Sequence, residues 1–354
     1  MTRFSVFALV SALSLPITTV ALAHDTGYTS ASGAALASCT APGEEQDPTA
    51  KADAALAFLA ALNEDQRGLV HHALDSAERT QWTNIPARGD VGGLRLGDLD
   101  DGQMQTLCTL LGSVLSAEGF EKLQAIMLGD DLRSIIDGEI NTGVGIGAFR
   151  LVLFGEPSAE TEWALQLDGH HVALNVTLDG NSYSMSPSFI GIFPRHFTVA
   201  DEDLSPMEGE VDLAHQFLAS LSAEQRAKAV VSETRGKIVT GPGNDGVVPE
   251  PEGLSGATLN GTQTGLLLAL AAQWIDMMPP SHARATRSRF LDGLDNTWFS
   301  WSGPTEPGSD ISYRIQGPDI VIEFAFDQRG GADGGDPTNH VHTMFRDLAN
   351  EYGG

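Results

Sequence analysis

The spacing of apolar residues predicts helices in the first third of the chain. Between Lys51 and Arg79 the apolar positions recur mostly three and four residues apart, which is the period of an amphipathic helix (Ala55, Phe58, Leu59, Leu62 and Leu69). Asn63 followed three residues later by Gln66 is typical of a capping box, so we expect a second helix to begin there. A further helix is predicted over residues 103–115, with its end near Gly119.

Alternation of apolar and polar residues predicts β-hairpins further along the chain. Residues 165–178 alternate around Asp168-Gly169, a dipeptide that favours a hairpin turn. The stretch "DIVIEFAFD", residues 319–327, also alternates, and it places Glu323 on the face opposite to Ile320, Ile322, Phe324 and Phe326. Helices combined with hairpins predict an α+β fold.

Two parts of the chain resemble each other in the same order. The stretch "FLAALNEDQR" (58–67) matches "FLASLSAEQR" (217–226), and the segment from Gly93 parallels the segment from Gly253. More weakly, "WALQLDGHHVALNVTL" from Trp163 resembles "SYRIQGPDIVIEFAFD" from Ser312. We therefore predict two pseudo-repeats, residues 51–200 and 201–354, each with helices followed by a β-hairpin and packed together as one large domain.

The first 23 residues have the pattern of a secretory signal peptide. Arg3 precedes an apolar run (4–22), and residues 21–23 fit the small-residue pattern of a cleavage site. An uncleaved anchor is the alternative, and Pro16, which interrupts the run, disfavours it. We expect residues 24–50 to form a flexible segment. Because no later apolar run reaches about 20 residues, we expect no stable membrane insertion after signal removal and a periplasmic or secreted location.

The charge and the cysteines narrow the possible partners. With 47 acidic and 20 basic residues, the chain has a formal net charge of −27. Such a field repels phosphate backbones, so nucleic acid is excluded as a partner and a small-molecule substrate or ligand is expected. In an oxidising compartment Cys39 and Cys108 could form a disulfide, although their spacing alone leaves the pairing open.

Four of the ten histidines lie in two tight pairs within predicted β regions. In His340-x-His342 both imidazoles project from the same face of a strand, so together they can chelate a metal. His170 and His171 are adjacent, so in a strand their side chains point to opposite faces. By this alternation His170 lies on the same, apolar face of the strand as Val172, whereas His171 lies on the opposite, more polar face.

These residues suggest a transition-metal site, with copper or zinc as the cofactor. The alignment of the two halves lets the hairpins meet, so that His171, His340 and His342 lie with Glu323; His170 is a further candidate ligand. Imidazole and carboxylate ligands suit zinc or copper better than calcium. Asp168 and Asn175 could orient the rings. In the structural alternative the histidines bind backbone groups or cap a loop.

Two arginines accompany the predicted site. Arg346 is in register with His342, where it could bind an anionic substrate group or pair with Asp347 or Glu351. Arg314 could form a salt bridge with Glu323.

The pattern leaves two reactions and two non-catalytic roles open, a binding protein and a structural or assembly factor. Zinc would activate water for hydrolysis with a carboxylate as base, and copper would support redox chemistry. The alternative is a non-catalytic periplasmic binding protein for a small polar or carbohydrate ligand, with Arg346 contacting the ligand and tryptophans stacking on it (Trp82, Trp163, Trp298 and Trp301).

Several motifs occur together and in order: "FGEPS", "WALQLDGHHVALN", "YRIQGPDIVIEF" and "HVHTMFRDLANEYGG". Together they resemble the family known as domain of unknown function 3500, whose members are secreted or periplasmic, over most of the chain from about residue 52. The resemblance implies one shared pocket without implying an activity, and its motifs match His170, His171, Arg314, Glu323, His340, His342 and Arg346. Among these, Glu323, Arg314 and Arg346 are the candidate catalytic residues.

Overall fold

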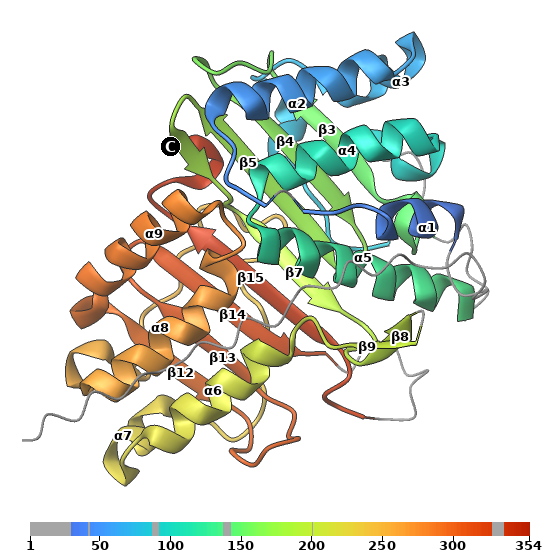
Figure 1. Ribbon diagram of the computed structural model, residues 1–354. Helices are drawn as coiled ribbons and strands as arrows, with labels where there is room; N and C mark the ends of the chain where they lie inside the picture. The colour runs from blue at the N-terminus through green and yellow to red at the C-terminus, as the bar shows by residue number, and fades with distance from the viewer. Residues whose placement is uncertain (1–29, 42, 87–91, 137–142, 200, 328–335) are drawn as a thin grey trace, which may run out of the picture.

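One large mixed sheet runs through both halves of the chain, and the longer helices pack against one of its faces (Figure 1). The computed structural model describes residues 30–41, 43–86, 92–136, 143–199, 201–327 and 336–354. The predicted signal peptide, residues 1–23, lies outside the described residues. Helices packed on one face of a large sheet form the α+β architecture that the residue pattern predicts.

Ten strands form the main path of the sheet. Their order is β1 (His71–His72), β3 (Arg150–Phe154), β4 (Trp163–Gly169), β5 (Val172–Asp179), β7 (Ser188–Ile192), β15 (Val341–Asp347), β14 (Ile320–Phe326), β13 (Ser312–Gln316), β12 (Trp298–Ser302) and β10 (Val230–Ser232). Three short strands branch from this path: β2 (Leu94–Arg95), β6 (Ser182–Ser184) and β11 (Leu254–Ser255). The β1–β3 and β10–β12 pairs are parallel, whereas β7 and β15 pair antiparallel at the centre.

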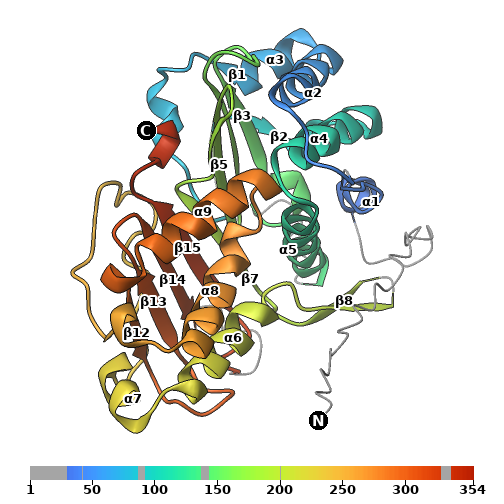
Figure 2. The same cartoon turned by 60° about the vertical axis from the view of Figure 1, so that its left-hand side comes forward.

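The helices form the second layer, and Figure 2 shows them on one side of the sheet with long loops and the C-terminus on the other. The longer ones are α2 (Pro48–Ala61), α4 (Asp101–Val114), α5 (Ala117–Ile136), α6 (Glu208–Ser220), α8 (Gly261–Ile275) and α9 (Pro280–Asp292). The shorter ones are α1 (Ala31–Ala37), α3 (Glu64–Val70) and α7 (Ala223–Ala229), and two strands, β8 (Phe197–Val199) and β9 (Glu202–Leu204), make a separate ribbon. Among the described helices, none combines the length and apolarity needed to cross a bilayer.

Six single-turn 3-10 helices complete the described elements. They are η1 (Ala77–Thr80), η2 (Leu96–Asp98), η3 (Ile146–Ala148), η4 (Gly256–Thr258), η5 (Leu294–Asn296) and η6 (Glu351–Gly353).

The main core lies between the helices and the sheet. The alternating apolar residues of β14 all enter it, as their spacing predicts (Ile320, Ile322, Phe324 and Phe326). The opposite face of the sheet is covered as well, by a smaller cluster that contains Trp82, Phe189 and Met344. Because both faces are covered, polar side chains on the second face are buried and need partners.

The helix predictions hold in part. A capping box between Asn63 and Gln66 begins α3 as predicted, but α3 ends at Val70 and the chain continues as β1. Gly119 does not end a helix; it lies in the first turn of α5, where its N–H donates to the hydroxyl oxygen of Ser116 at 2.8 Å. A Cβ at Gly119 would lie 2.4 Å from the carbonyl oxygen of Met277, so close packing explains this glycine.

The turn of the first hairpin differs from the prediction. Asp168 and Gly169 belong to β4, and the two turn residues are His170 and His171. Gly169 is needed for packing, because a Cβ there would lie 2.4 Å from the ring of Phe149. His171 takes the left-handed conformation, with φ of 68°.

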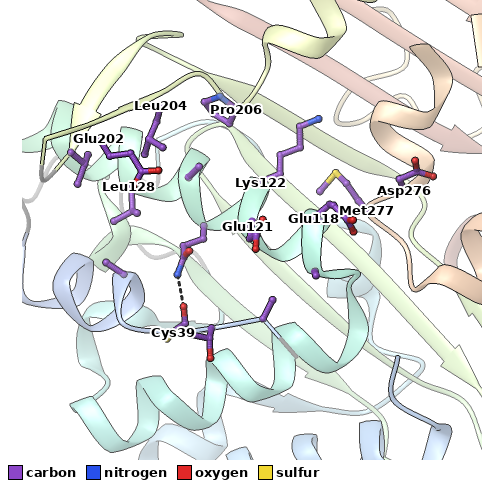
Figure 3. A pocket seen from close by; sticks show the side chains of 18 of the residues that line it. Cys39, Glu118, Glu121, Lys122, Leu128, Glu202, Leu204, Pro206, Asp276 and Met277 are labelled. Atoms are coloured by element: carbon purple, nitrogen blue, oxygen red, sulfur yellow. Dashed lines mark hydrogen bonds between the residues drawn. The ribbon is translucent and has the colours of Figure 1, made fainter. Parts of the chain in front are cut away.

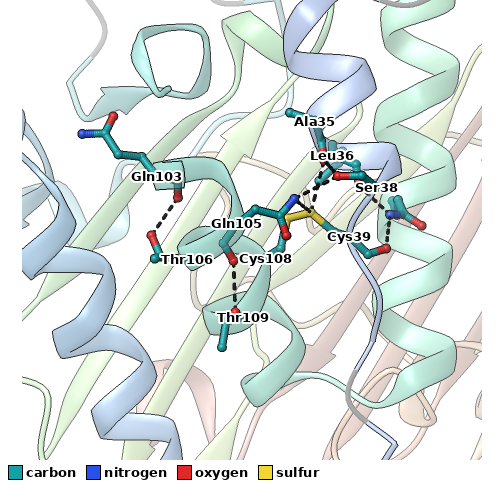
Figure 4. The surroundings of a disulfide bond; sticks show 10 residues. Ala35, Leu36, Ser38, Cys39, Gln103, Gln105, Thr106, Cys108 and Thr109 are labelled. Atoms are coloured by element: carbon teal, nitrogen blue, oxygen red, sulfur yellow. Dashed lines mark hydrogen bonds between the residues drawn. A yellow bond between two sulfur atoms is a disulfide. The ribbon is translucent and has the colours of Figure 1, made fainter. Parts of the chain in front are cut away.

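A disulfide between Cys39 and Cys108 joins the N-terminal segment to α4 (Figure 4). The side chain of Ser30 caps α1 by accepting a hydrogen bond from the N–H of Gly33. The flexible segment expected over residues 24–50 is therefore corrected in its later part: Ala31–Ala37 are helical, and α2 begins at Pro48.

Candidate metal centre

Three histidines converge where the two halves of the sheet meet. His171 comes from the β4–β5 turn, His340 directly precedes β15 and His342 lies within β15. The Nε2 atoms of His171 and His340 are 2.7 Å apart, and the ring centroids of His340 and His342 are 4.6 Å apart. One ring nitrogen from each residue lies within 4.8 Å of the others. The predicted common face of His340 and His342 is confirmed.

Strand pairing at β7 positions these rings. His342 lies opposite Gly191 in β7, and the N–H of Gly191 donates to the carbonyl oxygen of His171 at 2.7 Å. A Cβ at Gly191 would lie 3.1 Å from Cδ2 of His342 and 3.2 Å from Cδ2 of His171. It would also lie 2.5 Å from the carbonyl oxygen of Val341. Glycine at this position therefore leaves the space that both rings occupy.

A carboxylate lies beside one of the rings. Asp327 follows the end of β14, and its Oδ2 is 3.3 Å from Nδ1 of His342. The N–H of Asp327 donates to the carbonyl oxygen of His340 at 2.9 Å, which fixes the two chain segments relative to each other. A carboxylate next to the second nitrogen of a histidine sets which nitrogen can bind a metal.

A second group of possible ligands shares His171. Asp130 of α5 has its Oδ1 atom 2.5 Å from Nδ1 of His170 and 3.8 Å from Nδ1 of His171. The two adjacent histidine rings have centroids 3.8 Å apart and planes inclined by 34°. The expectation that these side chains point to opposite faces is therefore corrected. The two residues form a turn, so the alternation of a strand does not apply to them.

His171 is almost completely buried, with 1% of its surface exposed. Burial, and then the positive charges that His170, His340, His342 and Arg133 can carry, hold its pKa well below the usual histidine value. His171 is therefore neutral at neutral pH, and neutral imidazole is the form that binds metals. In the described part of the chain, no hydrogen-bond partner reaches its Nδ1 atom.

Glu323 does not join the histidines. It is buried in β14, where its carboxylate accepts hydrogen bonds from the N–H of Val239 at 3.1 Å and of Thr240 at 2.9 Å, and from the Thr240 hydroxyl at 2.6 Å. Neither group of possible metal ligands in the described residues includes it. The sequence expectation for Glu323 is corrected, because its carboxylate holds a loop on the sheet. Asp130 and Asp327 are carboxylates that lie beside the histidines.

The two candidate catalytic arginines are also engaged elsewhere. Arg346 is fully buried and pairs with Glu351, one nitrogen to oxygen distance being 2.7 Å. Its Nη1 donates to the carbonyl oxygen of Thr240 at 3.0 Å. Arg314 pairs with Glu252 at 2.8 Å, and its Nη1 lies 4.0 Å from Oε1 of Glu323, which is the ion pair that the sequence predicts. Of the alternatives for Arg346, pairing with Glu351 is the one observed.

The two residues expected to orient the rings contact other groups. Asp168 accepts a hydrogen bond from the N–H of Thr83 at 3.0 Å, and burial raises its pKa well above the usual range. Asn175 donates to the carbonyl oxygen of Pro187 at 2.7 Å and accepts from Gln166 at 2.7 Å. Both side chains therefore stabilise the hairpin and the loops that cover it.

Sequence reasoning missed three residues of the site. Asp130 carries a signal, since it is one of two adjacent aspartates within a largely apolar helix. Asp327 closes the alternating strand that pairs with the His-x-His segment. Gly191 carries no local signal, because its role depends on the rings that lie against it.

A separate cavity of about 860 Å³ lies on the helix-covered side, beside α5 (Figure 3). Its described lining includes several acidic residues and Lys122, whose ammonium group pairs with buried Glu210 and donates to the carbonyl oxygen of Gln273 at 3.1 Å. The acidic residues are Glu118, Glu121, Glu202 and Asp276. Neither the histidines of the site nor any aromatic side chain is among the described residues that line this cavity.

The fold and the site together define an α+β protein with a partly buried cluster of histidine and aspartate side chains that can hold a metal ion. The chain belongs to the family described as "Protein of unknown function (DUF3500)", whose model matches residues 44–354. No curated protein and no solved structure matches the chain.

Proposed function

We propose that this protein is a metalloprotein that binds one transition metal through His171, His340 and His342. The observation that carries the proposal is the approach of the His171 and His340 Nε2 atoms to 2.7 Å, with a nitrogen of His342 within 4.8 Å. At 2.7 Å the two nitrogens share a proton; a metal ion that replaces this proton binds both nitrogens once they stand about 3.3 Å apart. The ring nitrogen of His342 within reach and the carboxylate of Asp327 beside that ring both favour a cation.

The chemistry follows from the number of ligands. Three protein ligands around a metal leave a coordination position for water or substrate. With zinc, such a position activates water for hydrolysis, and the carboxylate of Asp327, beside His342, is a candidate for the base. With copper, a site of imidazoles supports oxidation and reduction. We therefore propose an enzyme, either a zinc hydrolase or a copper oxidoreductase, and the metal identity decides between them.

Elemental analysis of protein purified without chelator tests the proposal. We expect at least one equivalent of zinc or copper per chain, and one equivalent less in His342→Ala. His196→Ala is the matched control, since its side chain is 52% exposed and contacts Ser205 and Glu208. Wild-type protein without bound metal, or equal metal content in His342→Ala, would remove the proposal.

A second candidate, a non-catalytic binding protein, is favoured by the cavity beside α5. Its acidic lining suits a cationic or hydroxyl-rich ligand better than an anion. Trp82, Trp163 and Trp301 are buried and give no support to sugar stacking, whereas Trp298 is partly exposed. Thermal stabilisation by amines or polyols, combined with no response to metals, would favour this candidate.

We also propose that the chain consists of the two pseudo-repeats, residues 51–200 and 201–354. The parallel β1–β3 pair has a counterpart in β10–β12, and the capping box of α3 has one in α7. The side chains of Gln66 and Gln103 contact each other, as do those of Gln225 and Gln263. On this proposal the metal centre lies between the repeats, with His171 from the first and His340 and His342 from the second.

A secreted or periplasmic location completes the proposal. The Cys39–Cys108 disulfide supports it, because disulfides persist in oxidising compartments. The signal-like pattern of residues 1–23 agrees with this location.

A further inference from the structure

The side of His171 that faces away from His340 is unexplained by a single metal ion. Its Nδ1 atom is buried and lacks a hydrogen-bond partner within the described residues. A histidine that binds one metal usually donates its other N–H to a carboxylate or a carbonyl group. Asp130 faces this nitrogen, but the Nδ1 to Oδ1 distance of 3.8 Å is too long for a hydrogen bond.

We propose that the centre holds a second metal ion, bound by Asp130, His170 and Nδ1 of His171, so that the His171 ring bridges the two ions. Metal bonds to histidine nitrogen and carboxylate oxygen are about 2.0–2.2 Å long, so two ligands of one ion lie about 3.3–4 Å apart. The 3.8 Å between Nδ1 of His171 and Oδ1 of Asp130 fits this span. The hydrogen bond of 2.5 Å between Nδ1 of His170 and the same oxygen is shorter, and it lengthens by about 1 Å when the ion takes the place of its proton. One ligand atom from each of the three residues lies within 4.8 Å of the others. This inference rests on the proposed metal at His171, His340 and His342.

The surroundings hold these ligands in place. Oδ2 of Asp130 accepts a hydrogen bond from the N–H of Gly145 at 2.8 Å, while Oδ1 faces the histidines. The N–H of His171 donates to the carbonyl oxygen of Asn84 at 3.1 Å, and its carbonyl oxygen accepts from Gly191. Both hydrogen bonds maintain the left-handed turn, at φ of 68°, that brings the two rings together. The side chain of His170 is 17% exposed, so this end of the centre is accessible to ions.

The proton balance is simple. A neutral imidazole has one N–H and one lone pair, so a ring that binds two ions releases its N–H proton to solvent. The resulting anionic ring and the Asp130 carboxylate each offset part of the charge of the two divalent ions.

Equilibrium dialysis of the full chain against zinc(II), followed by elemental analysis, tests the stoichiometry. We expect two equivalents per chain in the wild type, one in His170→Ala and one in Asp130→Asn. His196→Ala should keep two. Thermal unfolding of each variant shows whether it is folded, and Asp130→Asn nearly preserves the side-chain shape.

The outcomes separate this inference from the proposed function. One equivalent in the wild type that is lost in His342→Ala but kept in His170→Ala overturns the second ion and leaves the proposed function standing. No bound zinc in this experiment, together with no bound copper when the chain is dialysed against copper(II), overturns both. Two equivalents that persist in both His170→Ala and Asp130→Asn overturn the assignment of ligands.

Copper(II) tests the bridge itself. Two copper(II) ions joined through one imidazole ring couple magnetically, so the doubly loaded wild type should give a weaker electron paramagnetic resonance signal than two isolated ions. His170→Ala should give the full signal of one ion. A full signal from two uncoupled ions in the wild type would contradict a bridge through His171.

Discussion

At the scale of single residues, two charged side chains on the covered second face of the sheet hold a loop in place through hydrogen bonds. Glu323 is 3% exposed and Arg346 is fully buried, and each one binds the backbone of the segment around Thr240. A buried charge is tolerated only when it is paired and hydrogen-bonded, and both residues meet this condition. In the folded chain both charged groups bind the loop around Thr240. The sequence shows that a charged residue lies in a strand, but it does not show which partner that residue binds.

Glu323→Gln tests this assignment. Glutamine keeps one acceptor oxygen but places an NH2 group against N–H donors, so we expect the free energy of unfolding to fall by about 1–3 kcal/mol. The metal content should not change. Chemical denaturation measures the first effect and elemental analysis the second. If metal binding were lost while the fold persisted, Glu323 would belong to the metal centre after all.

At the scale of elements, the junction of β7, β15 and the β4–β5 turn creates the site. The strands β5, β7 and β15 pair in regular antiparallel fashion. The ring of His171 meets the rings of His340 and His342 because β7 lies between β5 and β15. At Gly191 of β7, an added Cβ would meet atoms of both β15 and the β4–β5 turn.

Gly191→Ala should therefore disturb the centre without changing the chemistry of any ligand. The added methyl group would meet both rings and a carbonyl oxygen, so we expect reduced metal content and a loss of about 1–3 kcal/mol in stability. Gly68→Ala in α3 is the control, since nothing lies within 4 Å of a Cβ there. That change should keep the metal and can raise stability by up to about 1 kcal/mol. Equal metal content in both variants would contradict the close approach at Gly191.

At the scale of the whole molecule, the disulfide and the sheet connect segments that are distant in sequence. Cys39 and Cys108 are 69 residues apart, and the bond restricts the unfolded chain over that distance. Neither cysteine is among the possible metal ligands in the described residues.

We expect the double variant Cys39→Ala/Cys108→Ala to be less stable by about 2–4 kcal/mol, with unchanged metal content. Thermal unfolding measures the loss, and zinc analysis of the folded protein is the control. A variant as stable as the wild type would show that packing alone holds α1 on α4.

The amino-acid pattern by itself determined the α+β class, the apolar face of β14, the capping box at Asn63 and the shared face of His340 and His342. These features depend on residues close in sequence, so the spacing of those residues along the chain is enough to predict them. The tertiary structure alone decided that His170 and His171 form a turn, that Asp130 and Asp327 reach the histidines, and that Glu323 binds a loop. Partners 40 or more residues apart, such as Asp130 with His170, meet only after the layers pack. A buried polar side chain takes the partner that packing brings to it, and the local pattern does not specify which one.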